Sequence, residues 1–259
     1  MSRNVIVTGS GQGIGYAIAQ AFDKEGDRVF IFDMSKEVAE KAAQSLNNGI
    51  AYQVDVTDEE TIQSSIEDIT KQYGAIDVLV NNAGIQFISK IEDFPLEKWN
   101  QVVNVIQTGT FLMTKHVIPS MKQQQKGRII TISSAHGEMA DPFKSAYVAS
   151  KFAQIGFTKT TALEVVSDGI TANAVLPGPV RTSLIENQLA HLAEQDHSTE
   201  QEAMEKYITG KMPMNRLLEP SEIADTVIFL ASEGASAITG ETISVSGGSN
   251  AVSYTHLRA

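Results

Sequence analysis

Short apolar runs rich in valine and isoleucine recur along the first third of the chain, and most are bounded by glycine, aspartate or asparagine. Runs of this length and composition are typical of β-strands. Their apolar positions are largely continuous, which favours parallel strands that are covered on both faces. The pattern predicts strands over residues 4–8, 28–33, 51–54 and 77–81.

Stretches with helical spacing of apolar positions separate these runs, and the alternation continues almost to the C-terminus. Further strands are predicted over 128–133, 171–176 and 242–245, and helices over 15–24, 36–46, 59–72 (with Asp58 as its N-cap), 99–121, 145–166 and 220–231. Strict alternation predicts a single doubly wound, Rossmann-type α/β domain over residues 1–252, with about seven parallel strands and helices on both faces.

Residues 184–211 break this rhythm, because they are polar, rich in glutamine and glutamate, and helical in propensity. Their position after the sixth predicted strand makes them a candidate helical lid over a site at the carboxyl edge of the sheet. An ordinary pair of solvated surface helices is an equal alternative. Residues 253–259 follow the point where such a domain ends, and we interpret them as a cloning tail outside the fold.

The composition narrows the classes of function. The 259 residues carry a formal net charge of −11 with no basic stripe, which argues against a nucleic-acid partner. The absence of cysteine excludes disulfides and thiolate chemistry. No apolar run approaches the ~20 residues that span a bilayer, and the first predicted strand leaves no room for a signal peptide, so we expect a cytoplasmic protein without a membrane partner. His191 and His197 lack recognised ligand spacing, and we expect no metal site.

The sequence TGSGQGIG at residues 8–15 joins the first predicted strand to the first helix. Glycines let the backbone approach a pyrophosphate closely, and the helix N-terminus offers N–H groups and a positive dipole end. Asp33 closes the second strand ~20 residues further on, where a carboxylate accepts hydrogen bonds from ribose hydroxyls and repels a 2′-phosphate. We therefore predict a dinucleotide site that prefers NAD to NADP. The alternative is that Asp33 caps the next helix, although Ser35 could do so instead.

Tyr147 and Lys151 stand four residues apart in a predicted helix and so share one of its faces. A nearby ammonium favours the phenolate, so we expect Lys151 to lower the pKa of Tyr147 from its reference near ~10. A phenol tuned in this way can exchange a proton with a substrate oxygen. Ser134, at the end of the fifth strand, could hydrogen-bond the same oxygen. A tyrosine and a lysine at this spacing also occur as a plain surface pair.

Further short motifs follow the predicted strands. They are Asn81-Asn82-Ala83-Gly84, Ser134, the Tyr147–Lys151 pair, Pro177-Gly178 and Gly247-Gly248. Together with the glycine loop, these motifs resemble the short-chain dehydrogenase/reductase family over nearly the whole chain.

The resemblance implies an NAD-dependent oxidoreductase in which hydride passes between the nicotinamide ring and a carbonyl carbon. It implies that Tyr147 is the general acid/base, that Lys151 lowers its pKa and holds the nicotinamide ribose, and that Ser134 orients the carbonyl. Asp55 and Val56 would contact the adenine. The full set of cofactor-binding residues implied is Gly9, Gln12, Gly13, Ile14, Gly15, Asp33, Asp55, Val56, Asn82, Ala83, Gly84, Tyr147, Lys151, Pro177, Gly178, Val180 and Thr182.

One position departs from the family. Seven positions after the tryptophan of the fourth helix, the family usually carries an asparagine that holds a water relaying protons to the lysine. Here the residue seven after Trp99 is Ile106, which can neither donate nor accept through its side chain. Asn104 lies about 200° round the helix and points elsewhere. We expect lowered turnover with intact cofactor binding, and a catalytically weakened nucleotide-binding protein is the alternative from another class.

Four polar residues fall where the substrate pocket of the family lies, namely Gln86, His136, Lys144 and Gln188. One cation, one imidazole and two amides could hold a carboxylate. The surrounding strings NNAGIQF, SSAHG and PFKSAY are similar to D-3-hydroxybutyrate dehydrogenases of this family. That similarity implies that the four residues, with Ser134 and Tyr147, bind a small hydroxy acid or keto acid.

Other substrates stay open. Arg181 stands where those dehydrogenases often carry an aromatic residue, so the pocket shape is not defined by the similarity. Acetoin, a sugar or a 3-oxoacyl thioester are the alternative carbonyl substrates. Members of the family are mostly tetramers built on two long helices, which implies a homotetramer formed through 99–121 and 145–166.

Overall fold

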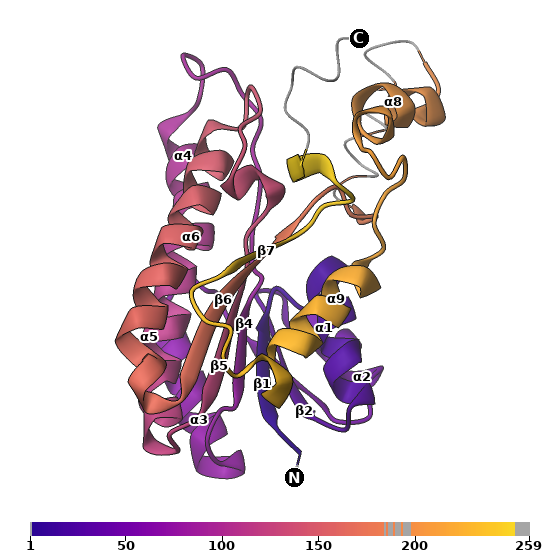
Figure 1. The fold of residues 1–259 in the computed structure, drawn as a ribbon. Coiled ribbons are helices and arrows are strands. Elements are labelled where there is room, and N and C mark those ends of the chain that lie inside the picture. The colour runs from indigo at the N-terminus through magenta and orange to yellow at the C-terminus, as the bar shows by residue number, and fades with distance from the viewer. Residues whose placement is uncertain (1, 184, 186–188, 190–192, 194–197, 252–259) are drawn as a thin grey trace.

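The computed structural model describes residues 2–183, 185, 189, 193 and 198–251. At its centre is a seven-stranded parallel sheet with the order β3-β2-β1-β4-β5-β6-β7 (Figure 1). This confirms the predicted doubly wound α/β domain. The strands are β1 (Asn4–Thr8), β2 (Arg28–Asp33), β3 (Gly49–Gln53), β4 (Val78–Asn81), β5 (Gly127–Ile132), β6 (Ile170–Pro177) and β7 (Thr242–Val245).

Helices cover both faces of the sheet (Figure 1). On one face lie α1 (Gly13–Lys24), α2 (Lys36–Gln44) and α9 (Pro220–Leu230). On the other face lie α3 (Glu59–Tyr73), α5 (Gly109–Gln123) and α6 (Ser145–Val165). Short 3₁₀ turns occupy Ala135–Gly137, Val166–Asp168, Thr209–Lys211, Glu233–Ala235 and Ser249–Ala251. No helix within the described residues has the length and apolarity to cross a membrane.

Successive residues of β1 enter different cores, which explains why its apolar run is continuous. Val5 and Val7 pack in the core beneath α1, α2 and α9. Ile6 packs in the core beneath α3, α5 and α6, where Phe30 and Phe32 of β2 join it. Because side chains alternate between the faces of a strand, a strand covered on both faces must be apolar throughout.

The helix predicted over 99–121 is a continuous run of α4 (Leu96–Val103), a π turn (Asn104–Thr108) and α5. The π turn contains Ile106, whose backbone carbonyl accepts hydrogen bonds from Thr110 Oγ1 at 2.7 Å and from Gln154 Nε2 at 3.3 Å. Ile106 is fully buried and Asn104 is exposed, so Asn104 points elsewhere as predicted. π turns of this kind are frequent at functional sites.

Part of the segment predicted as a lid, 184–211, is the helix α8 (Glu200–Tyr207). Thr199 and Glu202 form a capping box at its start, which satisfies backbone donors of the first turn. Figure 1 places α8 beyond the carboxyl ends of the strands. The lid role stays a prediction, and 253–259 lie outside the described residues.

Candidate active site

The carboxyl ends of β1 and β4 form the switch point of the sheet, because β2 and β3 lie on one side of β1 and the strands from β4 onward on the other. Ligands of open α/β sheets bind outside the carboxyl ends of the strands at such a point. The glycine loop after β1 and residues 82–84 after β4 meet there. The sheet topology therefore brings the two predicted cofactor-binding motifs to one edge.

Side-chain hydrogen bonds lock these two loops together. Thr8 Oγ1 accepts from the backbone N–H groups of Asn82 and Ala83, both at 3.0 Å. Asn82 Nδ2 donates to the carbonyls of Thr8 at 2.9 Å and Gly9 at 3.0 Å. Asn82 thus holds the glycine loop in shape through its amide group.

Two positions of the glycine loop have backbone in the left-handed region, and two others leave no room for a side chain. Gly9 and Gly13 have φ values of +60° and +58°, which favour glycine. A Cβ at Gly15 would lie 2.5 Å from Asn82 Nδ2 and from the Gly9 carbonyl, and one at Gly11 would collide with Val38 and Asp33. At its glycine positions the loop therefore presents backbone rather than side chains.

The first turn of α1 keeps its amide groups available. Gln12 is the N-cap in an extended conformation, but its side chain makes no capping hydrogen bond, and Gly13 and Ile14 open the helix. The opening N–H groups of a helix have no partner within the helix. Together with the glycines, this cradle fits the pyrophosphate of a dinucleotide. We call Gly9, Gly13, Gly15 and Asn82 the cofactor cradle.

Asp33 reaches the glycine loop from the end of β2. Its carboxylate accepts from Gly11 N at 3.2 Å and from Ser35 N at 3.1 Å. The side chain of Ser35 caps α2 by accepting from Val38 N at 3.3 Å. Ser35 thus serves as the cap, which leaves the half-buried Asp33 carboxylate beside the cradle.

Asp55 and Val56 have local structural partners. The exposed Asp55 accepts from the backbone N–H and hydroxyl of Thr57, at 2.9 and 2.8 Å. Val56 is buried in the core and packs where a Cβ on Gly109 would stand. The adenine contacts implied for both residues stay a prediction.

The segment after β6 reaches the cradle at Thr182. Its Cγ2 lies 3.7 Å from the position of a Cβ on Gly13. Pro177 ends β6, Gly178 packs against the backbone of Ser246, and Val180 pairs with Leu218 in an isolated bridge. These contacts place the end of the predicted nicotinamide segment opposite the glycine loop.

Ser134, Tyr147 and Lys151 converge at the carboxyl end of β5. Lys151 Nζ donates to the Ile132 carbonyl at 2.8 Å and lies 5.5 Å from the centre of the Tyr147 ring. The His136 ring packs edge-on against the Tyr147 ring, with centroids 6.0 Å apart. Ser134 is buried and accepts from His136 N at 3.1 Å. The phenol, hydroxyl and amine therefore share one neighbourhood.

The pKa of Tyr147 differs from the sequence-based expectation. Burial raises the pKa of the phenol, and the Ser134 hydroxyl offsets part of this rise. Burial also lowers the pKa of Lys151 to about 7. The net shift of this pKa is therefore upward, and the lowering effect expected of Lys151 stays a prediction. An amine that is itself desolvated holds its proton weakly near neutral pH, so desolvation of the phenol dominates.

Ile106 and the amine of Lys151 both lie close to Gly84. Its Cγ1 and Lys151 Nζ are each 3.8 Å from the position that a Cβ on Gly84 would take. Ile106 is fully buried in a small apolar cluster with Val102, into which Tyr147 also packs. The side chain of Ile106 thus adds apolar surface to the cluster that contains Tyr147.

Two of the four residues predicted to bind a carboxylate share an acidic partner that the sequence reasoning missed. Asp141 Oδ2 accepts from His136 Nε2 and from Lys144 Nζ, both at 2.9 Å. The hydrogen bond from His136, reinforced by Lys144, holds the pKa of the Asp141 carboxyl well below its usual range, although burial opposes it. The three-residue spacing of Asp141 and Lys144 was the available signal.

The other two residues predicted to bind the carboxylate are Gln86 and Gln188. Gln86 Nε2 is buried and meets no acceptor among the described residues. An orphaned buried donor is costly, so the position suits a ligand that brings an acceptor. Gln188 lies outside the described residues. We call Gln86, His136, Asp141 and Lys144 the substrate wall.

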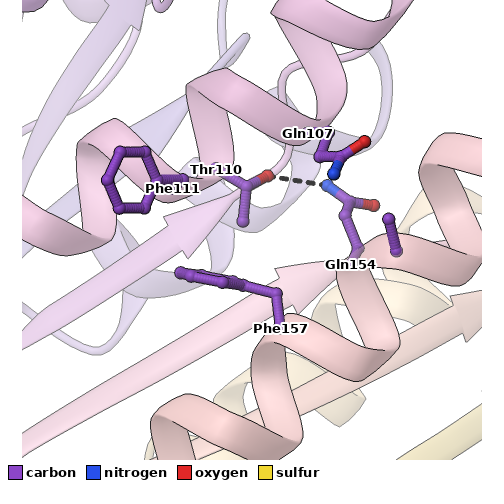
Figure 2. Close-up of a pocket in the computed structure, with 6 residues that line it drawn as sticks. Gln107, Thr110, Phe111, Gln154 and Phe157 are labelled. Atoms are coloured by element: carbon purple, nitrogen blue, oxygen red, sulfur yellow. Dashed lines mark hydrogen bonds between the residues drawn. The ribbon is translucent and has the colours of Figure 1, made fainter.

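A separate hollow of 230 Å³ lies between α5 and α6 (Figure 2). Figure 2 shows the hydrogen bond from Gln154 Nε2 to Thr110 Oγ1, 2.8 Å long, with the rings of Phe111 and Phe157 beside it. The lining includes none of the residues predicted for cofactor or substrate. The hollow is therefore separate from the residues predicted to bind cofactor and substrate.

Similar proteins are known for nearly the whole chain. A family model described as enoyl-(acyl carrier protein) reductase matches residues 9–250. The chain is 43% identical to the uncharacterized oxidoreductase YxjF of Bacillus subtilis, covering 94% of this chain and 96% of that one. It is 37% identical to a D-beta-hydroxybutyrate dehydrogenase of Rhizobium meliloti (96% and 98% covered) and 36% identical to the 3-oxoacyl-[acyl-carrier-protein] reductase FabG of Thermotoga maritima (94% and 96%).

Solved structures of similar proteins share the whole fold. An actinorhodin polyketide ketoreductase with NADPH superposes with a TM-score of 0.92 at 34% identity, covering 97% of this chain and 98% of that one. The aldohexose dehydrogenase of Thermoplasma acidophilum gives 0.89 at 34% identity, covering 98% and 96%. The chain belongs to the short-chain dehydrogenase/reductase family, and it is an oxidoreductase that uses a nicotinamide cofactor.

Proposed function

We propose that this protein interconverts D-3-hydroxybutyrate and acetoacetate with NAD. The observation that carries the proposal is the position of His136, which packs against the Tyr147 ring and shares an acidic partner with Lys144. A hydroxy acid whose hydroxyl meets Tyr147 can direct its carboxylate toward these two donors. The similarity to D-beta-hydroxybutyrate dehydrogenases supports the same substrate.

The chain's own residues position the substrate and move the proton. The bound dinucleotide supplies or accepts the hydride. Ser134 donates a hydrogen bond to the substrate oxygen, and the Tyr147 hydroxyl exchanges a proton with that oxygen. Lys151 holds the nicotinamide ribose, and when protonated it favours the phenolate. The cofactor cradle binds the pyrophosphate through backbone N–H groups.

Asp33 supports the choice of NAD over NADP. Its carboxylate is anchored at the glycine loop by Gly11 N and stands where an adenosine ribose would follow the pyrophosphate. Ribose hydroxyls can donate to this carboxylate, whereas a 2′-phosphate would meet a like charge. One similar structure holds NADPH, so cofactor preference is a direct test of the role of Asp33.

The test of this function follows reduced-nicotinamide absorbance with D-3-hydroxybutyrate and a small panel of other alcohols. The hydroxy acid should give the highest kcat/KM. Lys144→Ala should raise its KM about tenfold with little effect on kcat, because a charge-assisted hydrogen bond to the carboxylate is lost. An unaltered KM would contradict the carboxylate role of Lys144.

A neutral carbonyl compound is the second candidate substrate. The observation that favours it is Asp141, whose carboxylate already meets His136 and Lys144. The similarity to a 3-oxoacyl reductase and to a polyketide ketoreductase points the same way. Higher kcat/KM for acetoin, a sugar or a 3-oxoacyl thioester in the same panel would establish this candidate over the hydroxy acid.

The active form is proposed to be a homotetramer whose subunits meet through α5 and α6. These helices expose apolar side chains, among them Phe111, Phe152 and Leu163, the last with 82% of its surface exposed. The hollow lined by Phe111 and Phe157 lies on the same helix pair. Light scattering should give the mass of four chains, and Leu163→Glu should lower it.

A further inference from the structure

We propose that Asp141 is an internal counter-ion that competes with a carboxylate ligand for His136 and Lys144, and thereby sets the affinity of the substrate wall for anions. This inference rests on the proposed function insofar as the anion is the substrate. It concerns a residue that neither the glycine loop nor the catalytic group contains.

The geometry places one carboxylate oxygen where a ligand oxygen would bind. Asp141 Oδ2 lies 2.9 Å from both His136 Nε2 and Lys144 Nζ. These are the distances of strong, charge-assisted hydrogen bonds. A ligand carboxylate that approaches the same two donors would therefore have to replace Asp141 or share them with it.

The burial of the three side chains makes that replacement feasible. The side chain of Lys144 is 16% exposed and that of His136 is 22% exposed, whereas that of Asp141 is 48% exposed. The acid therefore sits on the solvent side of its two partners. Water can take over the hydrogen bonds of the partly exposed Asp141 carboxylate when it turns outward. The two donors stay in place, and a ligand carboxylate that replaces Asp141 offers them equivalent acceptors.

A third donor in the wall has no such partner. Gln86 Nε2 is buried without an acceptor among the described residues. The segment that carries Gln86 is tied to the loop of Asp141, because Ser89 N donates to the Phe143 carbonyl at 2.9 Å. Phe143 has a φ of +68°, a conformation that a bulky residue adopts only when its surroundings hold it there. The segment and the loop are thus joined, with two donors satisfied by Asp141 and the Gln86 donor left without an acceptor among the described residues.

The negative charge of Asp141 affects how strongly the wall attracts an anion. Asp141 cancels the charge of Lys144, so an incoming carboxylate exchanges one anion for another and gains little net attraction. Neutral ligands do not compete with Asp141 in this way. The residue therefore weakens anion binding selectively and shifts the balance between acidic and neutral substrates.

The test measures binding of butyrate, a carboxylate that cannot react, to the NAD-saturated protein by calorimetry. Asp141→Asn keeps the shape of the side chain and removes its charge, and it should bind butyrate about three- to tenfold more tightly than the unchanged protein. Asp141→Glu keeps the charge and should show no gain. Glu92→Gln is the matched control, because Glu92 lines the same surface hollow as Asp141 and pairs with neither donor.

Each outcome decides the matter. The proposal is overturned if Asp141→Asn and the unchanged protein bind butyrate equally well, or if neither binds it measurably. An equal gain in Glu92→Gln would overturn it as well. Turnover of D-3-hydroxybutyrate is measured in the same variants. A gain in butyrate affinity without turnover of the hydroxy acid in any variant supports the counter-ion and removes the proposed substrate, so the two failures are distinguishable.

Discussion

The cofactor cradle and the substrate wall lie near one edge of the sheet but are built by different kinds of contact. In the cradle, backbone groups and the amide of Asn82 hold the loops, and glycines remove side chains that would collide. In the wall, partly exposed ionic side chains hold each other, with Asp141 between His136 and Lys144. Close backbone contacts tolerate few substitutions, whereas ionic contacts can be exchanged. We therefore expect single substitutions within the cradle to impair cofactor binding, and charge changes in the wall to alter substrate choice.

The largest expected effect comes from Tyr147→Phe, which tests whether catalysis can be lost while cofactor binding is kept. Loss of the hydroxyl should lower kcat by about 10²–10⁴-fold, because the proton donor and acceptor is gone. Cofactor affinity, measured by fluorescence titration, should stay unchanged, since the cradle is untouched. Tyr73→Phe is the control, because Tyr73 contacts Asn4 at the amino end of β1, away from the cradle. A small effect of Tyr147→Phe on kcat would remove the phenol from the mechanism.

Lys151 should make stability depend on pH. Its pKa is about 7 in the folded protein and 10.5 ordinarily, so between these values the unfolded chain binds more protons. Stability therefore rises with pH in this window, by about 1.4 kcal/mol per unit, and the dependence disappears below pH 7. Urea unfolding of the unchanged protein and of Lys151→Met from pH 7 to 9.5 measures it. Parallel curves for the two proteins would contradict a depressed pKa.

Gly15→Ala breaks the cradle directly. A methyl group would lie 2.5 Å from Asn82 Nδ2 and from the Gly9 carbonyl, so the two loops must separate. We expect a loss of about 1–3 kcal/mol in cofactor binding free energy, measured by titration. Gly156→Ala is the control, because its methyl group would meet nothing within 4 Å. Equal cofactor affinity in both variants would show that the close approach at Gly15 is unimportant.

Asp33→Ala sharpens the assignment of the cofactor. Removing the carboxylate deletes acceptors for the ribose hydroxyls and the repulsion of a 2′-phosphate, so the ratio of kcat/KM for NAD over NADP should fall about tenfold. Steady-state rates with both dinucleotides measure this ratio. Glu40→Ala, which removes a surface carboxylate of α2, should leave it unchanged. If Asp33→Ala also leaves it unchanged, another group sets the preference.

Ile106→Asn should have the smallest effect and the opposite sign. Ile106 and the buried amine of Lys151 both lie close to Gly84. A polar side chain at position 106 would bring water to this region and open a path for protons, so kcat should rise several-fold. The KM for the cofactor should stay the same, because Ile106 lies outside the cradle. Rates of single variants at saturating substrate test this, and a kcat equal to or below that of the unchanged protein would defeat the hypothesis.

Much of the fold was predictable because its signals are local. The apolar runs of β1 and β2, the N-cap Asp58 and the alternation of strands and helices all appear in the structure. The π turn around Ile106 was not predictable, because its register depends on packing between α4, α5 and α6. The meeting of Ser134, Tyr147 and Lys151 was expected from motifs, whereas Asp141 was missed because ion pairing depends on how a loop is folded.

By itself, the sequence determined the parallel α/β architecture, the glycine loop and the residues able to carry acid–base chemistry, since periodicity and residue type act over short distances. The tertiary structure decided how those groups behave. Burial raised the pKa of Tyr147 where a neighbouring charge was expected to lower it. The fold also brought Asp141 onto His136 and Lys144. Desolvation and ion pairing depend on what surrounds a group in space, and a linear chain does not specify those surroundings until it has packed.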